Sequence, residues 1–301
     1  MLILDESHYV KNHKTRRWKA LRVAARKATH VFLLSGTPTP SRVEELWAQL
    51  ALIDRQLPSY WHWTKTFCGA KKSIFGWDVS GATNIPRLKA YLRDKMVRRK
   101  KSMVLTLPEK VFSVIPVKIR PKDQEVLWQR WQSINKELQS SEDSKLDFER
   151  KRIVSNLYHM SAHAKVDVAK KIVLDLYNAK TPFVAFAFHR VLLDAVSDTV
   201  PCIRIDGDTK NRQELVDRFQ DGTYRCACLS IKAAGCGLTL TAATIMVFLE
   251  LSFSPGEMRQ CEDRIHRLGQ TQSCSYYYLI CTKFDEWQLK KIQRKEQKLF
   301  I

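Results

Sequence analysis

The sequence predicts an α/β protein in which parallel β-sheets are flanked by helices. From about Lys165 onward, short apolar runs alternate with amphipathic stretches of helical length. Two of these runs, Phe183–Phe188 and Ile245–Leu251, are almost entirely apolar, which is typical of parallel strands buried on both faces. A chain of 301 residues has room for about two domains. We therefore expect two α/β lobes.

The first lobe is expected within residues 1–110. Apolar segments at Met1–Leu4 and Val31–Leu34 predict short strands, and helices are expected over 15–26 and Glu44–Ile53. The stretch Trp61–Asn84 is rich in tryptophan and glycine and is expected to be an irregular insertion. Its aromatic side chains have two interpretations, packing within the insertion or stacking on nucleic-acid bases.

Residues 111–164 are expected to be linking helices. Pro108 and Pro116 bracket a strand-like run and indicate a domain boundary. The segment Gln124–Gln139 carries one apolar stripe at helical spacing and predicts an amphipathic helix.

The second lobe is expected over residues 165–290, followed by a basic tail over 291–301. A helix over Val166–Tyr177 precedes its first strand. Strands are expected at Phe183–Phe188, Cys202–Ile205, Cys226–Leu229, Ile245–Leu251 and Tyr276–Ile280. Helical stretches between several of these strands indicate a parallel sheet with helices on each side.

Basic residues outnumber acidic residues by a wide margin. The 51 Lys and Arg against 31 Asp and Glu give a formal charge of +20. This excess suits a solvated surface, but it also suits a polyanionic partner, and the basic run Arg93–Lys101 is dense enough to form a stripe. Charge alone leaves both interpretations open.

The eight cysteines indicate free thiols rather than a metal site. No Cys-x-x-Cys pair occurs, and Cys226 and Cys228 stand two apart in an apolar segment, on one face of a strand. Free thiols fit a reducing compartment, so we expect an intracellular protein of the cytoplasm, the nucleoid or an infected host cell, with the nucleus also open. No apolar run approaches the ~20 residues of a membrane helix, and the first residues do not resemble a signal peptide.

Carboxyl and hydroxyl groups follow the first two apolar segments. Asp5 and Glu6 follow the first, where one carboxylate of a nucleotide hydrolase holds Mg²⁺ through water and the next activates the attacking water. An exposed carboxylate pair at a strand end is the alternative. Ser35–Pro38 follows the second segment and is a turn by composition, although its hydroxyls could sense a nucleotide on the adjacent strand.

Arg264 and Arg267 stand within the segment Gln260–Gln270. Their spacing of three predicts that both guanidinium groups lie on one face of a helix. Such a pair can reach the γ-phosphate of a nucleotide and stabilise transition-state charge, an effect on the order of 10³–10⁵ in rate. A solvated basic helix face is the alternative.

In this order, the segments resemble the Swi/Snf-type ATPases of helicase superfamily two, most closely their annealing-helicase branch. The segments that resemble motifs II to VI of that family are Asp5–His8, Leu33–Pro38, Phe186–Arg190, Ser230–Leu240 and Gln260–Gln270. Ordered matches to several motifs rarely arise by chance, and the resemblance runs from residue 2 to about 285. It implies RecA-like lobes, an incomplete first and a complete second. The sequence departs from the family pattern at Ser252–Pro255 and at Thr239, neither of which removes a catalytic charge.

The resemblance implies ATP and Mg²⁺ as cofactors and roles for individual residues. The implied catalytic residues are Asp5, Glu6, Arg264 and Arg267, with Asp5 holding Mg²⁺ through water. The implied nucleotide site adds His8, Gly237 and Gln260. Coupling between nucleotide and DNA is implied for Ser35, Gly36 and Thr37. Contacts to the DNA backbone are implied for His189, Arg190, Ser230 and Lys232.

A phosphate loop is missing from the sequence. Such a loop needs Gly-x-x-x-x-Gly-Lys-Ser/Thr, because small residues let backbone N–H groups surround the phosphates while the lysine neutralises them. None of the ten glycines is followed by Lys and then Ser or Thr. We therefore expect that this chain alone hydrolyses little or no ATP, and that its first lobe exposes apolar sheet surface.

Three functional hypotheses remain at this point. The first is a DNA-stimulated ATPase that translocates on duplex or branched DNA, with a phosphate loop supplied, for instance, by a separate chain. The second is a DNA-binding module without catalysis, and the third is an inactive remnant. A neighbouring reading frame that encodes Gly-Lys-Ser/Thr would favour the first.

Overall fold

The structure is a computed structural model that describes residues 1–36, 38–39, 42–73, 76–99, 101–140 and 144–298. The chain divides into two units. The first consists of Met1–Arg98, Ser254–Gly256 and Ile292–Ile301, and the second of Arg99–Phe253 and Glu257–Lys291. Each unit contains hydrophobic clusters of its own.

The first unit contains a parallel pair of strands at the positions expected from the sequence. Strand β1 (Leu2–Leu4) pairs with β2 (Val31–Leu33). The 3-10 helix η1 (Ser7–Val10) and helix α1 (Arg16–Lys27) connect them, and α2 (Glu45–Ile53) follows. One face of the pair packs against α1 and α2.

The opposite face of this pair is apolar and exposed. Ile3, Phe32 and Leu34 are 52%, 51% and 51% exposed. Exposed apolar side chains on a sheet face normally meet a further layer of structure. The expected exposure of apolar sheet surface is therefore confirmed for this face.

Helix α1 begins where a threonine caps it. The Thr15 hydroxyl accepts the backbone N–H of Trp18 at 3.2 Å, which satisfies one of the donors that a helix start leaves open. The indole N–H of Trp18 then donates to the carbonyl of Ala48 in α2 at 2.6 Å. This buried hydrogen bond joins α1 to α2.

The insertion after α2 is regular, which corrects the expectation from its composition. It forms α3 (Tyr60–Phe67), the antiparallel hairpin β3–β4 (Lys71–Ser73 and Gly76–Asp78) and α4 (Ile85–Leu92). Aromatic and β-branched residues make α3 a weak helix former by propensity alone. Trp63, however, is fully buried in a cluster that α2, α3 and α4 share, so tertiary packing stabilises the helix.

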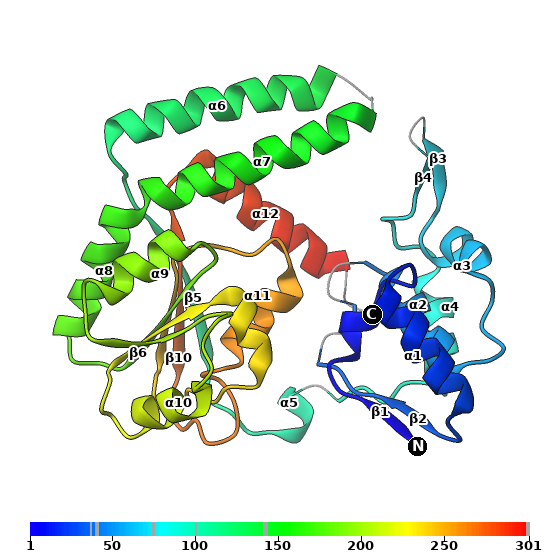
Figure 1. Cartoon of the computed structure of the whole chain (residues 1–301). Helices are drawn as coiled ribbons and strands as arrows, with labels where there is room; N and C mark the ends of the chain where they lie inside the picture. The colour runs from blue at the N-terminus through cyan, green and yellow to red at the C-terminus, as the bar shows by residue number, and fades with distance from the viewer. Residues whose placement is uncertain (37, 40–41, 74–75, 100, 141–143, 299–301) are drawn as a thin grey trace. The chain divides into compact units, whose positions relative to one another are not determined.

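The second unit is built on a six-stranded sheet in which every pairing is parallel (Figure 1). The strand order is β5-β10-β9-β6-β8-β7. The strands are β5 (Lys110–Pro116), β6 (Phe183–Ala187), β7 (Cys202–Ile205), β8 (Cys226–Ser230), β9 (Ile245–Phe248) and β10 (Cys274–Ile280). Each strand overlaps a run from which the sequence predicted one, and the predicted α/β class is confirmed.

Helices alternate with these strands. They are α5 (Lys101–Val104), α6 (Pro121–Ser140), α7 (Ser144–Ala164), α8 (Val166–Asn178), α9 (Arg190–Ser197), α10 (Arg212–Gln220), α11 (Pro255–Glu262) and α12 (Lys283–Lys298), with the 3-10 helix η2 (Ile231–Cys236) after β8. No helix in the described part of the chain combines the length and the hydrophobicity that crossing a bilayer requires.

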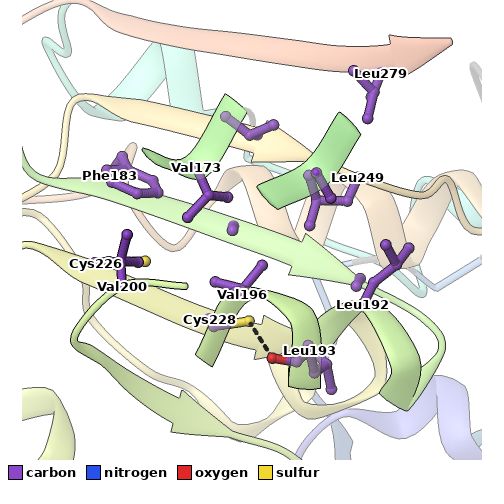
Figure 2. Close-up of a cluster of buried hydrophobic side chains, with 14 of the residues drawn as sticks. Val173, Phe183, Leu192, Leu193, Val196, Val200, Cys226, Cys228, Leu249 and Leu279 are labelled. Carbon is purple, nitrogen blue, oxygen red and sulfur yellow. Dashed lines mark hydrogen bonds between the residues drawn. The ribbon is translucent and has the colours of Figure 1, made fainter. Parts of the chain in front are cut away.

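One face of the large sheet packs against α8 and α9 in a dry cluster (Figure 2). Val173 of α8 and Leu193 of α9 meet Phe183, Cys226 and Cys228 from the strands. Burial raises the pKa of both thiols well above the usual range, so they stay neutral. The expectation of buried free thiols on one strand face is confirmed for this pair.

Strand β5 extends the sheet ahead of residue 165, where the second lobe was expected to begin. It pairs with β10 along its whole length, from Lys110 to Pro116. Helices α6 and α7 also belong to this unit, because Leu157 and Tyr158 of α7 pack against Phe284 of α12. The second unit of the structure thus includes segments that the sequence interpretation set apart as linking helices.

Candidate functional site

A first group of candidate residues lies in the first unit, at the carboxyl edge of β1 and β2. Asp5 and Glu6 follow β1, and Ser35 follows β2. The backbone N–H of Leu34 donates to β1, and its carbonyl accepts from Ser7, both at 2.8 Å. Because the carboxyl ends of adjacent parallel strands share one edge of a sheet, motifs II and III are brought together there.

His8 connects the two motifs. Its Nδ1 lies 3.1 Å from Ser35 Oγ and 3.1 Å from Glu6 Oε2. The His8 side chain is only 10% exposed, so water has little access to these contacts. Ser35 is therefore one side chain away from the carboxylate that is implied to activate water.

Glu6 has an unusual backbone conformation. Its φ of 48° and ψ of 47° lie in the left-handed region, which costs an L-residue about 1–2 kcal/mol. Such conformations persist where the surroundings hold them, and they cluster at functional sites. Here the Glu6 N–H donates to Asp5 Oδ1 at 2.8 Å, and the Ser7 N–H is anchored on β2 through Leu34.

A buried glutamine that was not predicted from the sequence, Gln49, links the same two motifs through hydrogen bonds. The Ser7 hydroxyl donates to Gln49 Oε1 at 3.0 Å, and Gln49 Nε2 donates to the carbonyl of Pro38 at 2.6 Å. Gln49 is 4% exposed. In the sequence, the sign of this role was a single amide side chain within the apolar run of α2. Gly36 is exposed with open space around it, and Thr37 lies outside the described residues.

Asp5 has the donor chemistry that Mg²⁺ requires. Its carboxylate is exposed at the strand end. In phosphate-transfer sites Mg²⁺ is held by one or two carboxylates together with water and phosphate oxygens, so a single exposed aspartate fits. Among the described residues no three His, Cys, Asp or Glu side chains converge on one point.

A second group of candidate residues lies in the second unit, where two arginines contact one loop. Arg264 Nη1 donates to the carbonyl of Leu238 at 3.4 Å. Arg267 Nη1 donates to the carbonyls of Gly237 and Leu238 at 3.3 and 3.2 Å. Gly237 has φ 72° and ψ 12°, a conformation that favours glycine. Motif V thus presents its carbonyls to both guanidinium groups of motif VI.

The prediction that both arginines lie on one helix face is wrong. Helix α11 ends at Glu262, and the following residues, 263–269, form turns, here called the arginine turn. The two guanidinium groups still converge, because the Leu240 N–H donates to the carbonyl of Arg264 at 2.9 Å and docks the turn against motif V. Tertiary hydrogen bonds replace the helical ladder at this point.

Gln270 closes the arginine turn. Its Nε2 lies within hydrogen-bond distance of the carbonyls of Thr241, Ala243 and Ile265, at 3.1, 2.9 and 3.1 Å. Burial of an amide is favourable only when its polar atoms have partners, and this one has them. Gln260 lies half-buried on α11, and its implied role at the nucleotide remains a prediction.

Two lysines, one in α5 and one at the start of β5, hold the arginine turn, which sequence reasoning did not anticipate. Lys101 Nζ lies 2.7 Å and Lys110 Nζ 3.2 Å from Asp263 Oδ1. Lys110 also lies 3.4 Å from Glu262 Oε2, and Lys101 donates to the carbonyl of His266 at 3.0 Å. The charges are complementary in the sequence, but more than 150 positions separate the partners. Lys101, part of the basic run, is therefore committed to the protein itself.

His266 adds a further contact between the arginine turn and the residues just before β5. Its Nε2 lies 2.8 Å from the carbonyl of Pro108, and a carbonyl only accepts, so Nε2 carries the proton. Burial lowers the pKa of His266, and the charges of Lys110 and Lys101 lower it further. The imidazole is therefore neutral and works as a donor that fixes the turn.

Two of the residues implied to contact DNA are exposed. Lys232 is exposed in η2, with its ammonium 4.7 Å from the ring centre of Phe188. Arg190 begins α9 with a side chain that is 68% exposed, and it pairs with the exposed Asp208. Both remain available to a phosphate backbone.

The other two are less exposed, His189 being half-buried and Ser230 buried. His189 Nδ1 lies 2.6 Å from Oε1 of the fully buried Glu250, whose Oε2 accepts the backbone N–H of Phe188 and of His189 at 2.8 Å each. His189 therefore shapes the loop after β6. Ser230 is 8% exposed at the end of β8. A direct role for these two at DNA remains a prediction.

Comparison with known proteins matches both parts of the chain. Residues 1–170 match the SNF2-related domain, and residues 164–269 match the helicase conserved C-terminal domain. Over 98% of its length the chain is 38% identical to SWI/SNF-related matrix-associated actin-dependent regulator of chromatin subfamily A-like protein 1 of Xenopus tropicalis. Over 99% it is 36% identical to DNA annealing helicase and endonuclease ZRANB3 of Mus musculus. It covers 32% and 29% of these two proteins, or about a third of their length.

A solved structure supports the fold. The chain is similar to the Sulfolobus solfataricus SWI2/SNF2 ATPase core in complex with dsDNA, with a TM-score of 0.52 and 20% identity, over 99% of this chain and 68% of that one. The expected architecture of RecA-like lobes, the resemblance to Swi/Snf-type proteins and the annealing-helicase branch are thereby confirmed. Because the SNF2-related match covers more than half of its residues, the chain belongs to the SNF2-related family.

Proposed function

We propose that this chain is the part of a DNA-dependent ATPase that carries its catalytic carboxylates and its arginines, and that the motor translocates on duplex or branched DNA and remodels it. The convergence of Arg264 and Arg267 on one loop of motif V carries this proposal. Asp5 and Glu6 supply the carboxylates in the first unit. The names of two relatives, an annealing helicase and an ATPase core in complex with dsDNA, agree with it.

The arginine contacts suggest how nucleotide and DNA are coupled. In the structure both guanidinium groups donate to neutral carbonyls of Gly237 and Leu238. A charge-assisted bond to phosphate is roughly twice as strong as one to a neutral acceptor. Binding of ATP would therefore draw Arg264 and Arg267 from the carbonyls. The loop that is released directly follows η2, where Lys232 is exposed for DNA.

Glu6 would take the proton from the attacking water. Its left-handed backbone and the neighbouring His8 hold the carboxylate in place before the reaction, so little reorganisation is needed. Mg²⁺, held by Asp5 through water, would neutralise charge on the phosphates when bound. The family uses ATP, and we propose Mg²⁺ as a second cofactor because the Asp5 carboxylate is a ligand of the kind that Mg²⁺ prefers.

DNA binding by this chain would be largely independent of sequence and sensitive to salt. The charge of +20 and the exposed Lys232 and Arg190 favour contacts to phosphates over contacts to bases. The logarithm of the binding constant should then fall with the logarithm of salt concentration, by about 0.9 for each phosphate contact on a duplex. An ATPase acting on DNA in a reducing compartment implies an intracellular protein.

The phosphate loop has to come from residues outside this sequence. Because phosphoryl transfer depends on a cradle for the β- and γ-phosphates, the 301 residues alone are expected to release little phosphate. The comparisons offer no support for a separate chain as the source.

A DNA-stimulated phosphate-release assay tests the proposal in two forms of the chain. The first form is the 301-residue chain, and the second is the same chain fused behind a segment that carries the phosphate-loop sequence Gly-x-x-x-x-Gly-Lys-Ser/Thr. The fusion should show DNA-stimulated turnover that Glu6→Gln abolishes and that Arg267→Ala lowers by on the order of 10³-fold or more. Arg218→Ala on α10, which removes an arginine that stacks on Tyr224 outside the site, is the matched control and should have no effect.

Two results would contradict the proposal. Turnover of the fusion that survives both Glu6→Gln and Arg267→Ala would show that these residues are not catalytic. Turnover of the unfused chain that Glu6→Gln abolishes would show that a phosphate site exists within these residues. A fusion that binds duplex DNA but never hydrolyses ATP would favour the binding-module hypothesis.

A further inference from the structure

The hairpin β3–β4 presents an exposed indole in the insertion of the first unit. It stands between α3 and α4 in the sequence and projects away from these helices (Figure 1). Lys71, Lys72 and the whole of Gly76–Asp78 are exposed, and Trp77 is 47% exposed. A two-stranded hairpin is only marginally stable by itself, and an indole left in water adds little to it. Packing therefore accounts for only part of Trp77, which keeps nearly half of its surface exposed.

Trp77 belongs to a row of two indoles between two lysines, which we call the indole row and which is formed by Lys65, Trp61, Trp77 and Lys72. Lys72 stands directly opposite Trp77 in the antiparallel register, so both side chains lie on one face of the hairpin. The ring centres of Trp77 and Trp61 are 4.2 Å apart at an interplanar angle of 79°. Lys65 Nζ lies 5.2 Å from the ring centre of Trp61. A cation thus flanks the two indoles at each end.

The edge-to-face geometry leaves room for a third ring. Indoles at 79° do not stack on each other, because one of them presents its edge. The exposed part of Trp77 is therefore available to a flat partner. The more buried Trp61 supports it from behind and is itself covered by Lys65.

The surroundings of the row favour an anion. Asp78 is the one acidic residue in the described part of the hairpin, and Arg42 and Lys71 act on it. The pKa of Asp78 is lowered first by hydrogen bonds from Ser80 and then by these two charges. With Lys65 and Lys72 at the ends of the row, cations outnumber this single carboxylate.

We propose that the indole row binds an unpaired DNA strand, with one base stacked on Trp77 and the adjacent phosphates on Lys65 and Lys72. Proteins that bind single strands combine aromatic platforms with cations in this way, and stacking does not depend on the identity of the base. A duplex keeps its bases stacked inside and offers none to Trp77. The inference rests on the proposed action on branched DNA, and it names the unpaired strand of such a branch as the ligand of this surface.

Fluorescence anisotropy with labelled oligothymidylate and with a duplex of equal length tests the inference on the 301-residue chain. Trp77→Ala should weaken binding of oligothymidylate about tenfold, equivalent to about 1.4 kcal/mol, and should change duplex binding less than about twofold. Trp77→Phe should retain most of the affinity, and Trp77→Leu, which keeps an apolar side chain, should lose it. Lys72→Ala should lower the salt dependence for the single strand by about 0.7.

Trp128→Ala is the matched control. Trp128 is 40% exposed on α6 and makes none of the ring contacts recorded among the described residues, so its loss should leave both affinities unchanged. Thermal unfolding of Trp77→Leu and Trp77→Phe establishes that the hairpin is intact in both.

The possible results separate this inference from the proposed function. Loss of affinity for both ligands in Trp77→Ala, or equal affinity of Trp77→Leu and Trp77→Phe for the single strand, overturns the inference. Failure of the wild-type chain to bind the duplex, while the single strand still binds through Trp77, overturns the proposed duplex contact and leaves the indole row standing.

Discussion

Replacing Asp285 by alanine is expected to destabilise the second unit strongly. Lys165 Nζ lies 2.6 Å from Asp285 Oδ1, and both side chains are 2% exposed. Asp285 Oδ2 accepts the backbone N–H of Cys281 and of Thr282, each at 2.9 Å. The carboxylate therefore neutralises a buried ammonium group and caps the first turn of α12 as well.

The magnitude follows from these contacts. An ammonium group left buried without its carboxylate costs on the order of 3–5 kcal/mol, and loss of the cap adds about 1 kcal/mol. A domain has roughly 5–15 kcal/mol of stability in total, so Asp285→Ala removes a large share. Lys165→Met leaves the carboxylate with its backbone donors and should cost less, on the order of 1–3 kcal/mol. The double variant should be more stable than Asp285→Ala alone.

The pH dependence distinguishes the variants. Burial acts to lower the pKa of Lys165, but the charge of Asp285 outweighs it, and the net pKa is raised above 10.5. The contribution of the pair to stability is therefore present below that value and lost only as pH rises through the folded pKa. In Asp285→Ala the largest charge that raises the pKa is gone and burial, the largest cause of all, outweighs the smaller effect of Glu250, so the folded pKa of Lys165 falls below its unfolded value. The unfolded chain then binds more protons, and the stability of the variant rises with pH.

Urea unfolding followed by far-ultraviolet circular dichroism measures both effects. The wild-type chain, the two single variants and the double variant are compared at about pH 7 and at about pH 9, below the unfolded pKa of lysine. Between the two pH values the midpoint of Asp285→Ala should rise by more than that of the wild type, because both chains share the titration of Cys202 but only the variant has a lysine with a lowered pKa. A midpoint of Asp285→Ala equal to that of the wild type, or independent of pH, would refute the reasoning that Lys165 is buried and charged.

Three smaller perturbations test the arginine turn, the carboxylates after β1 and the core. His266→Gln keeps a hydrogen-bond donor for the carbonyl of Pro108 but removes the imidazole. Because the pKa of His266 is lowered in the folded protein, the wild type loses stability as pH drops below about 6.5. The urea midpoint of His266→Gln should therefore change less than that of the wild type between about pH 7 and pH 5. Glu6→Gly relieves a φ of 48° and should raise the unfolding free energy of the first unit by about 0.5–1 kcal/mol in thermal unfolding, while abolishing turnover of the fused chain. Cys202, whose pKa is lowered to about 7 by a hydrogen bond from Cys226, should react with iodoacetamide before the buried cysteines, as read by mass spectrometry.

For each of these three predictions, a control or a specific result would contradict the reasoning. Lys180 also has a positive φ, 59°, so Lys180→Gly should match the gain in stability of Glu6→Gly without loss of turnover. A less stable Glu6→Gly would mean that contacts of the carboxylate outweigh the backbone strain. An unchanged pH profile of His266→Gln would assign that titration to another group. Equal labelling of Cys202 and Cys228 would contradict the difference in their pKa values.

Local patterns were sufficient to predict most strands and the fold class. Phe183 and Cys226 stand in short apolar runs that have no helical period, and a run of that kind is favourable only inside a sheet covered on both faces. Motifs II and III were also predictable as neighbours, because Asp5 and Ser35 follow adjacent parallel strands. In these cases the conformation of a segment is determined by the residues within it or next to it in the sequence.

The remainder depends on contacts between distant segments. Asp263 follows a good helix, and nothing nearby indicates that the helix ends before Arg264; the end is set by Lys101 and Lys110, far earlier in the chain. Similarly, α3 has a composition that disfavours helix, and burial of Trp63 by other helices decides the matter. A single sequence shows charges and apolar residues but does not show which distant partner each of them meets.

The pairing of β5 with β10 has a consequence for the order in which the protein folds. β5 is the first strand of the second unit to be synthesised, and β10 is the last. Because β10 lies between β5 and β9, the earliest strand has no neighbour in the sheet until the latest one is available. Contacts of such long sequence separation slow folding. During synthesis on the ribosome, β5 therefore stays unpaired until Ile280 at the end of β10 has been synthesised. Its apolar residues remain 44–50% exposed even in the finished sheet, namely Val111, Phe112 and Val114.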